Sequence, residues 1–278
     1  MPELPEVETI RRQLAIVGVA RTITKLRIQD PLIVAPNSPN RVRRAVEGRR
    51  IERVHRRGKY LLVVLDSGTT LAMHLRMTGR LHYSPTGQAP LDKHRRARFE
   101  LDDGATLDFS DTRRFGRMWI VPARHPDTER YWSARLGVEP LERQFTAARL
   151  ARLLAGRTAP IKASILDQKL IAGVGNIYAD EALFQAGVHP TRPAGSLDAD
   201  EVAALRDAIR DRLRVGIRSG GASIDRYRDT IGESGSMQDM LRVHLHQGDP
   251  CPYCGTTIVK TRVAQRGTYL CPTCQPVG

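Results

Sequence analysis

Apolar residues near the N-terminus recur with the spacing of an α-helix. They stand three or four positions apart, with polar residues between them: Val7, Ile10, Leu14 and Val17. This period predicts one amphipathic helix of about three turns, which ends near Gly18. Pro5 with Glu6 beside it favours a helix start, because proline suits the first turn and carboxylates suit the positive end of the helix dipole. The chain therefore opens with a helix.

The hydrophobic pattern then shortens to that of β-strands. Six strands are predicted: Thr22–Ile28, Ile51–Arg57, Tyr60–Asp66, Thr70–His74, Arg98–Leu101 and Thr106–Phe109. Asp-Ser-Gly at 66–68 and Asp-Asp-Gly at 102–104 are typical of hairpin turns. Arg41–Val46 has the pattern of a short helix packed alongside. Many short strands with such turns predict a sandwich or a barrel that extends to about residue 135.

Beyond a linker at residues 136–141 the pattern is helical. Four helices are predicted: Phe145–Leu154, Ile161–Leu166, Gly175–Ala186 and Ala199–Ser219. Asp198 or Ser196 would cap the last of them. Residues 220–238 are rich in glycine and serine without a clear period, which is typical of a mobile loop. We therefore expect an α+β fold with several domains: an N-terminal lobe at 1–135, a helical lobe at 136–240 and a small C-terminal part at 241–278.

The charge balance indicates the partner. Lys and Arg number 44 against 30 Asp and Glu, a net charge of +14. Such an excess suits a polyanion, with nucleic acid as the leading partner and an anionic membrane surface as the other class. The chain has no apolar run of about eighteen residues that would span a bilayer, and its N-terminus lacks the pattern of a signal peptide. We expect a cytosolic protein, with access to the nucleoid if the source is a bacterium.

All four cysteines lie close to the C-terminus. Cys251 and Cys254 form one C-x2-C pair, and Cys271 and Cys274 form a second after sixteen intervening residues. This spacing predicts one structural zinc ion held by four thiolates on two turns joined by a hairpin. Two disulfides or a redox pair are the alternatives, but a cytosolic location argues against disulfides, and no βαβ pattern surrounds the cysteines. The hairpin between the pairs is basic, as expected for a nucleic-acid contact.

Basic clusters also occur in the first half of the chain. Residues 41–59 contain nine Lys or Arg and two acids, residues 93–98 read Lys-His-Arg-Arg-Ala-Arg, and residues 112–117 place Phe115 among arginines. Arginine with an apolar wedge suits a protein that fills a gap in a base stack. Phe115 and Met77 would equally suit a hydrophobic core. Gly173-Val174-Gly175 before a helix permits a close phosphate contact, or is an ordinary turn between helices.

The first residues carry candidate chemistry. Pro2 follows the initiator Met1 directly, and removal of Met1 would leave a secondary amine at the N-terminus. Such an amine attacks carbonyl-like carbons and forms a Schiff base that stays positively charged. Glu3 and Glu6 place carboxylates close to that nitrogen. The same residues also suit a helix start without any catalytic role.

Taken together, the chain resembles the formamidopyrimidine-DNA glycosylase family, also known as 8-oxoguanine DNA glycosylases. The resemblance spans essentially the whole chain and rests, besides the cysteines, on residues 1–8 (MPELPEVE), 57–61 (RGKYL), 74–79 (HLRMTG), 111–116 (DTRRFG), 173–179 (GVGNIYA) and 264–268 (AQRGT).

The resemblance implies an N-terminal helix with a β-sandwich, a helix–two-turn–helix lobe and a zinc β-hairpin, with damaged duplex DNA in a basic cleft and a monomeric enzyme. It implies that Pro2 is the nucleophile, that Glu3 transfers protons and that Lys59 contacts phosphate and lesion. Arg266 is implied as a phosphate clamp within the catalytic set. The implied DNA-binding residues are His94, Lys162 and Asn176, with Met77, Arg113 and Phe115 filling the void left by an extruded nucleotide.

Two departures from the family pattern concern lesion choice and phosphate binding. Ser236-Met237 stands where the family commonly has an aromatic pair, in a loop associated with the purine lesion. Residues 243–246 read Val-His-Leu-His instead of Val-Tyr-Gly-Arg, which removes a cationic side chain. The expected function is excision of oxidised purines with cleavage of the abasic strand. An endonuclease VIII-like enzyme for oxidised pyrimidines and a non-catalytic zinc-finger damage sensor are the alternatives.

Overall fold

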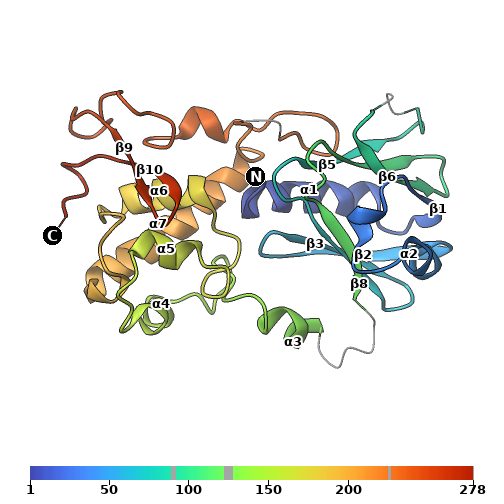
Figure 1. Ribbon diagram of the computed structural model, residues 1–278, viewed down its shortest axis with the longest axis horizontal. Helices are drawn as coiled ribbons and strands as arrows, with labels where there is room; N and C mark the ends of the chain where they lie inside the picture. The colour runs from blue at the N-terminus through green and yellow to red at the C-terminus, as the bar shows by residue number, and fades with distance from the viewer. Residues whose placement is uncertain (89–91, 122–127, 225–226, 278) are drawn as a thin grey trace. The chain divides into compact units, whose positions relative to one another are not determined.

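The computed structural model describes residues 1–88, 92–121, 128–224 and 227–277, with the backbone alone at residues 128–130. The chain folds into two compact units (Figure 1). Unit 1 comprises Met1–Trp132 and Ser219–Ser236, and unit 2 comprises Ser133–Arg218 and Met237–Gly278. Residues 219–236 therefore pack with the N-terminal part, although the sequence groups them with the helical lobe. The three-part division at 135 and 240 stays a prediction.

Unit 1 joins one long helix to an eight-stranded antiparallel sheet. Its helices are α1 (Leu4–Val17), the 3-10 turn η1 (Pro31–Val34), α2 (Pro39–Val46) and α3 (Thr128–Ser133), which ends at the unit boundary. Its strands are β1 (Thr22–Ile28), β2 (Arg49–Arg57), β3 (Tyr60–Leu65), β4 (Thr70–His74), β5 (Gly79–Ser84), β6 (Arg95–Leu101), β7 (Thr106–Asp111) and β8 (Arg117–Val121). The strand order is β5-β7-β6-β1-β2-β3-β4-β8.

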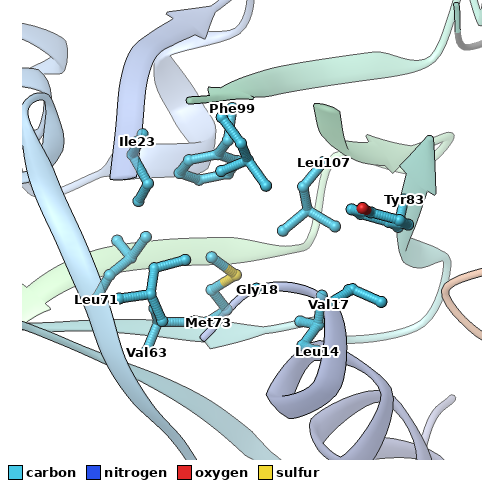
Figure 2. Close-up of a pocket in the computed structure, with 12 residues that line it drawn as sticks. Leu14, Val17, Gly18, Ile23, Val63, Leu71, Met73, Tyr83, Phe99 and Leu107 are labelled. Carbon is cyan, nitrogen blue, oxygen red and sulfur yellow. The ribbon is translucent and has the colours of Figure 1, made fainter. Parts of the chain in front are cut away.

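The sheet forms two halves that enclose one core. Only two register pairs, Thr22↔Arg50 and Ile23↔Arg49, join β1 to β2, and apolar residues from both sides of this join belong to one buried cluster. Figure 2 shows Phe99 and Leu107 from one half facing Leu71 and Met73 from the other, above the end of α1. The space between them is a small apolar cavity of about 20 Å³. This is the interior of the predicted sandwich, and it is lined by apolar side chains together with Tyr83.

Unit 2 is helical, with a C-terminal hairpin. Its elements are α4 (Ala147–Leu154), α5 (Ile161–Leu166), α6 (Asn176–Gln185), η2 (Ala194–Ser196), α7 (Ala199–Arg218), η3 (Met237–Met240), β9 (Val259–Val263) and β10 (Arg266–Leu270). Asp198 caps α7, because its Oδ1 accepts the backbone N–H of Glu201 at 2.8 Å. None of the helices in the described ranges is long and apolar enough to cross a membrane. The α+β class and the predicted succession of sheet, helices and zinc hairpin are confirmed.

Two strands were missing from the prediction. β5 and β8 stand at the two ends of the sheet order, where a strand pairs on one side only. β5 opens with Gly79, whose backbone N–H still donates to Leu75 O in the preceding turn. β8 mixes buried and half-buried positions without strict alternation. Edge position hid both strands from the hydrophobic pattern, and in β8 weak alternation added to this.

Candidate functional site

The N-terminal residues form a buried helix start. Pro2 and Glu3 are buried, and Glu3 is the N-cap of α1. The Glu3 side chain accepts from the Glu6 backbone, and Glu6 Oε2 accepts the Glu3 N–H at 2.7 Å. This reciprocal capping box fixes the backbone next to Pro2. The structural and the chemical interpretations of these residues are therefore compatible, since the cap holds the candidate nucleophile in place.

Lys59 lies in the turn between β2 and β3, at the end of β2 on which α1 packs. Its side chain is only 6% exposed, and the preceding Gly58 has a φ of +56°, which favours glycine. Arg56 Nε donates to Glu8 Oε2 at 3.2 Å and ties this end of β2 to α1. Burial alone would raise the pKa of Glu8, but hydrogen bonds from Arg11 and Arg12 outweigh it and lower that pKa. Glu8 therefore stays charged, and the ion pair anchors the helix that begins beside Pro2.

His74 is a neighbour of this turn that the sequence analysis did not single out as a site residue. It pairs with Tyr60 in the β3–β4 register, and the two rings meet edge-on with centroids 4.6 Å apart. Burial, with the charges of Arg76 and Lys59, lowers the pKa of His74 to about 3. The neutral ring accepts the Arg76 N–H on Nδ1 at 2.9 Å, so its proton lies on Nε2. No local pattern marks this residue, because its environment comes from neighbouring strands.

Two adjacent turns present the candidate gap-filling residues. Met77 follows β4 and is 41% exposed, and Phe115 precedes β8 and is 46% exposed. The guanidinium of Arg113 lies over the Phe115 ring, 4.7 Å from its centroid. The alternative that Met77 and Phe115 belong to the core is wrong, because both side chains reach solvent. Exposed apolar groups beside an arginine suit insertion into a base stack.

One buried carboxylate connects these turns. Asp111 is 1% exposed. Its Oδ1 accepts from the Thr78 hydroxyl and from the Arg113 N–H, and its Oδ2 accepts the Gly116 N–H at 2.7 Å. The Asp111 N–H in turn donates to His94 O at 2.9 Å. Met77, His94, Arg113 and Phe115 are therefore held at one end of the sheet around a single residue.

Arg114, by contrast, serves the fold. It has a φ of +59°, and its guanidinium makes two hydrogen bonds to the buried Asp30, at 2.6 and 2.9 Å. These bonds lower the pKa of Asp30. Of the two adjacent arginines, Arg113 is thus the one whose side chain stacks on the exposed Phe115.

In unit 2, Lys162 and Asn176 grip the tip of the C-terminal hairpin. Lys162 Nζ and Asn176 Nδ2 each donate to Gly267 O at 2.9 Å. Arg266, the residue before Gly267, is exposed and follows a tight turn at Ala264 and Gln265 with positive φ. Lys162 was predicted to bind DNA, yet it is fully buried, and its ammonium also contacts Asp180 Oδ1 at 2.6 Å. In this arrangement Lys162 and Asn176 hold the backbone next to Arg266 and thereby orient the Arg266 side chain.

His244 occupies one of the positions where the sequence departs from the family pattern. Its Nδ1 lies 2.7 Å from Asp180 Oδ2, and its ring meets Tyr269 of β10 edge-on. The neighbouring Glu181 is fully buried and accepts the backbone N–H groups of residues 242–244. His244 thus fastens the chain before the hairpin to α6, and it is not a metal ligand.

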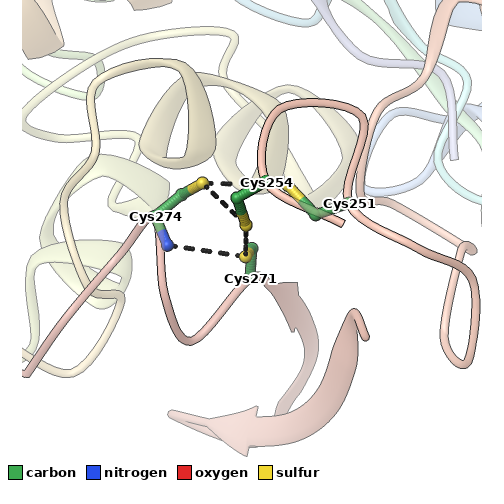
Figure 3. Close-up of side chains that lie close together, drawn as sticks. All are labelled: Cys251, Cys254, Cys271 and Cys274. Carbon is green, nitrogen blue, oxygen red and sulfur yellow. Dashed lines mark hydrogen bonds between the residues drawn. The ribbon is translucent and has the colours of Figure 1, made fainter. Parts of the chain in front are cut away.

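The four cysteines converge on one point (Figure 3). All four Sγ atoms lie within 4.8 Å of one another, with Cys254 Sγ 3.5 Å from both Cys271 and Cys274 and Cys251 Sγ 3.8 Å from Cys274. Tetrahedral zinc with Zn–S bonds of about 2.3 Å needs sulfurs about 3.8 Å apart. No disulfide joins them. The predicted structural zinc site is confirmed, and the alternative of two disulfides is wrong.

Comparison with known proteins identifies the family. Residues 1–118 match the formamidopyrimidine-DNA glycosylase N-terminal domain, residues 136–228 match the H2TH domain of the same enzymes, and residues 248–277 match a zinc finger found in FPG and IleRS. The chain is 46% identical to the formamidopyrimidine-DNA glycosylase of Roseiflexus sp. over 99% of this chain and 100% of that protein. The chain belongs to the formamidopyrimidine-DNA glycosylase family.

Solved structures of formamidopyrimidine-DNA glycosylases share the fold along the whole chain. The MutM (FPG) protein of Thermus thermophilus is 41% identical, with a TM-score of 0.88 over 100% of both chains. The Lactococcus lactis enzyme in complex with DNA containing an abasic site is 34% identical, with a TM-score of 0.91 over 99% of both chains. A Lactococcus lactis mutant in complex with Fapy-dG DNA gives a TM-score of 0.92 at 34% identity, over 99% of this chain and 100% of that chain. The predicted family is confirmed, and the protein is a DNA repair glycosylase for oxidised bases.

Proposed function

We propose that this glycosylase excises oxidised purines, such as 8-oxoguanine and formamidopyrimidines, through a Schiff base to Pro2 and then cleaves the abasic strand. The observation that supports this most directly is the capping box that holds Pro2 and Glu3 at the start of α1. The amine that Met1 removal exposes would lie at the positive end of the helix dipole, which disfavours its protonated form. Burial disfavours that charge further, so the nitrogen keeps its lone pair.

The chemistry follows from that amine. A base inside a duplex must first be extruded, at a cost of a few kcal/mol. Pro2 N then bonds to C1′ and the bond from C1′ to the base nitrogen breaks, so the base leaves with its electron pair and takes up a proton. Pro2 N then loses its proton and the C1′–O4′ bond breaks, with O4′ taking a proton from Glu3, so that the sugar opens and an iminium forms. The iminium acidifies the C2′ hydrogen, and loss of that proton expels the 3′ phosphate. A second proton loss expels the 5′ phosphate, and water then releases the sugar fragment from Pro2. Glu3 is the proposed proton carrier at the opened sugar.

The DNA contacts are proposed from the same geometry. Lys59 and His94 would bind backbone phosphates in unit 1, while Met77, Arg113 and Phe115 fill the void left by the extruded nucleotide. In unit 2, Lys162 and Asn176 would act on phosphates largely through Gly267 and Arg266. The net charge of +14 supports a salt-dependent grip on duplex DNA. We further propose a monomer that works on chromosomal DNA in the bacterial cytoplasm.

Zinc has a structural role in this proposal. Cys251, Cys254, Cys271 and Cys274 would hold it with four thiolates, which leaves no coordination position for water or substrate. The metal would therefore stabilise the hairpin that carries Arg266 and supply no chemistry to the reaction. Every catalytic step above uses groups of the N-terminal unit.

Trapping of the covalent intermediate tests the nucleophile. Borohydride should reduce the Schiff base and crosslink the protein to duplex DNA that carries 8-oxoguanine or an abasic site. Pro2→Gly should lose most of this adduct while duplex affinity persists, because only the ring amine is removed. Wild-type protein that binds the duplex without any trapped adduct would favour the non-catalytic damage sensor. Unchanged cleavage by Pro2→Gly would exclude Pro2 as nucleophile.

The lesion class needs a separate experiment. Met237, at the departure from the family pattern, is fully buried, whereas Ser236 is exposed, so the aromatic pair is replaced by one small polar and one inward-facing group. The endonuclease VIII-like alternative predicts that thymine glycol is excised faster than 8-oxoguanine. Single-turnover rates on otherwise identical duplexes decide between the two, and our proposal requires the faster rate on 8-oxoguanine.

A further inference from the structure

Residues 219–224 and 227–236 form a segment that contacts the helix beginning beside Pro2. Glu6 Oε1 accepts the Ala222 N–H at 2.8 Å while its Oε2 accepts the Glu3 N–H, so one buried carboxylate bridges the segment and the catalytic end of α1. Gly221 has a φ of +89°, and a Cβ there would lie 2.8 Å from Glu6 Cγ. The Tyr227 hydroxyl donates to Glu6 O at 3.3 Å. Two hydrogen bonds to the Glu6 carboxylate, one from the Ala222 N–H and one from the Glu3 N–H, therefore connect this end of the segment to the Glu3 backbone.

A second anchor lies two turns further along α1. Gln13 Oε1 accepts both the Thr230 N–H at 3.0 Å and the Thr230 hydroxyl at 2.7 Å, and its Nε2 donates to Asp229 Oδ2 at 2.6 Å. Thr230 is fully buried, and its carbonyl accepts the Tyr83 N–H of β5 at 2.7 Å. Seven residues separate Gln13 from Glu6, so both side chains leave the same face of α1 about 10 Å apart.

The partners of Gln13 are themselves fixed. Asp229 Oδ1 accepts the N–H groups of Ile231 and Glu233 at 3.0 and 2.9 Å, which orients Oδ2 toward Gln13. The Asp229 N–H also donates to Glu233 O. The Gln13 amide thus meets a closed turn with one acceptor and two donors facing it, and all three are satisfied by a single side chain. Only a group with both a donor and an acceptor matches this arrangement.

We propose that Gln13 is a positioning residue that sets the segment formed by residues 219–224 and 227–236 for recognition of the extruded base. The inference rests on the proposed function, because it requires a base to be bound at C1′ beside Pro2. A base in that position lies next to the segment that Glu6 ties to Glu3. If Gln13 releases the Asp229 turn, the segment keeps its Glu6 anchor and the bond from the Tyr83 N–H to Thr230 O. The side-chain contacts that fix the Asp229 turn on α1 are lost, and the backbone beside the base shifts. Attack on C1′ at an abasic site needs no base, so it does not depend on Gln13.

The amide of Gln13 and the carboxylate of Asp229 can be exchanged between the two positions. Gln13→Glu places a carboxylate against Asp229 and removes the only donor of the pair. Adding Asp229→Asn restores a donor, because the new amide nitrogen replaces Oδ2 while Oδ1 still accepts from Ile231 and Glu233. The double variant therefore rebuilds all three contacts with the amide and carboxylate exchanged. Ile16→Glu on the same helix is the charge-matched control, since Ile16 is 82% exposed.

The test compares two reactions of the full-length zinc-loaded enzyme. Gln13→Glu should slow single-turnover excision of 8-oxoguanine by about tenfold to a hundredfold, the effect of a misplacement of about 1 Å. Cleavage at a preformed abasic site in the same duplex should change less than twofold. The double variant should return excision to within about threefold of wild type, and Ile16→Glu should leave both rates unchanged. Unchanged excision, an equal loss of both reactions, or no rescue by the double variant would overturn the proposal.

Hydrogen exchange separates this proposal from the proposed function. The Thr230 amide should exchange at least tenfold faster in Gln13→Glu, and the double variant should restore its protection. This measurement needs no substrate. Wild-type enzyme that excises no oxidised purine would refute the proposed function alone, whereas unaltered exchange at Thr230 would refute the role of Gln13 whatever the enzyme cleaves.

Discussion

His74 should make the stability of unit 1 depend on pH between neutrality and mild acid. Its imidazole is 6% exposed, and burial next to Arg76 and Lys59 lowers its pKa from 6.5 to about 3. Below pH 6.5 the unfolded chain binds a proton at this residue and the folded chain does not. Stability from this group is therefore complete above about pH 6.5 and is lost as the pH falls toward 3.

The magnitude follows from the shift. A pH of 5 lies about 1.5 units below the ordinary pKa of histidine, so the unfolded imidazole is almost fully protonated there. Each of these units corresponds to about 1.36 kcal/mol. His74 should thus lower the free energy of unfolding by about 2 kcal/mol at pH 5 relative to pH 7. His74→Asn removes the titration and keeps an acceptor for the Arg76 N–H. The variant should lose about 2 kcal/mol less than wild type over the same interval, whatever its stability at pH 7.

Urea unfolding followed by tryptophan fluorescence measures this directly. Trp119 and Trp132 lie 5.8 and 5.0 Å from the Tyr60 ring, which contacts His74, so both report on the part of unit 1 in question. Other groups titrate equally in both proteins, and the difference between the two pH profiles isolates His74. Parallel profiles between pH 7 and pH 5 would refute the reasoning, since they would mean that the folded imidazole is protonated as easily as the unfolded one.

Lys162→Met should destabilise unit 2 by about 3–5 kcal/mol in thermal or denaturant unfolding followed by circular dichroism, because it leaves the Asp180 carboxylate buried without its cation. Adding Asp180→Asn should recover part of that loss, and full stability of the single variant would contradict the buried pair. Chelation of zinc should unfold the C-terminal hairpin and weaken duplex binding at least tenfold in fluorescence anisotropy, with recovery on adding zinc but not magnesium. Binding that survives proven zinc loss would show that the hairpin folds without metal. Gly116→Ala should cost about 1–3 kcal/mol, since its Cβ would lie 2.7 Å from Phe109 Cζ and 3.0 Å from Asp111 Oδ2. Wild-type stability of that variant would mean that the turn relaxes freely.

Local patterns predicted much of the secondary structure. The strands Thr22–Ile28 and Thr70–His74 have the predicted bounds, and the helix before Gly18 starts at Leu4 as the proline and acids indicated. These signals arise from residues within one or two turns of each other, where periodicity and capping act directly. The edge strands Gly79–Ser84 and Arg117–Val121 escaped because their pairing partners, not their own pattern, define them.

The site residues also divide into those that local spacing predicted and those whose state depends on distant contacts. The cysteine spacing was sufficient to predict zinc, since each C-x2-C turn carries its own geometry. The exposure of Met77 and Phe115 was not predictable, because the same side chains suit a core and a wedge. The buried state of Lys162 was also not visible, since Gly267 lies 105 residues away in the chain.

The sequence by itself determined the helix start near Pro5, the strand-rich and helical regions, the zinc ligands and the basic charge. Each of these depends on composition or on neighbours along the chain. Only the tertiary structure decided which groups are desolvated and which distant partners they meet. Asp111 joins two turns, His74 stays neutral among cations, and Gln13 holds Thr230 across 217 residues. Burial and hydrogen-bond partners of this kind depend on where the chain returns in space, and no local period encodes that return.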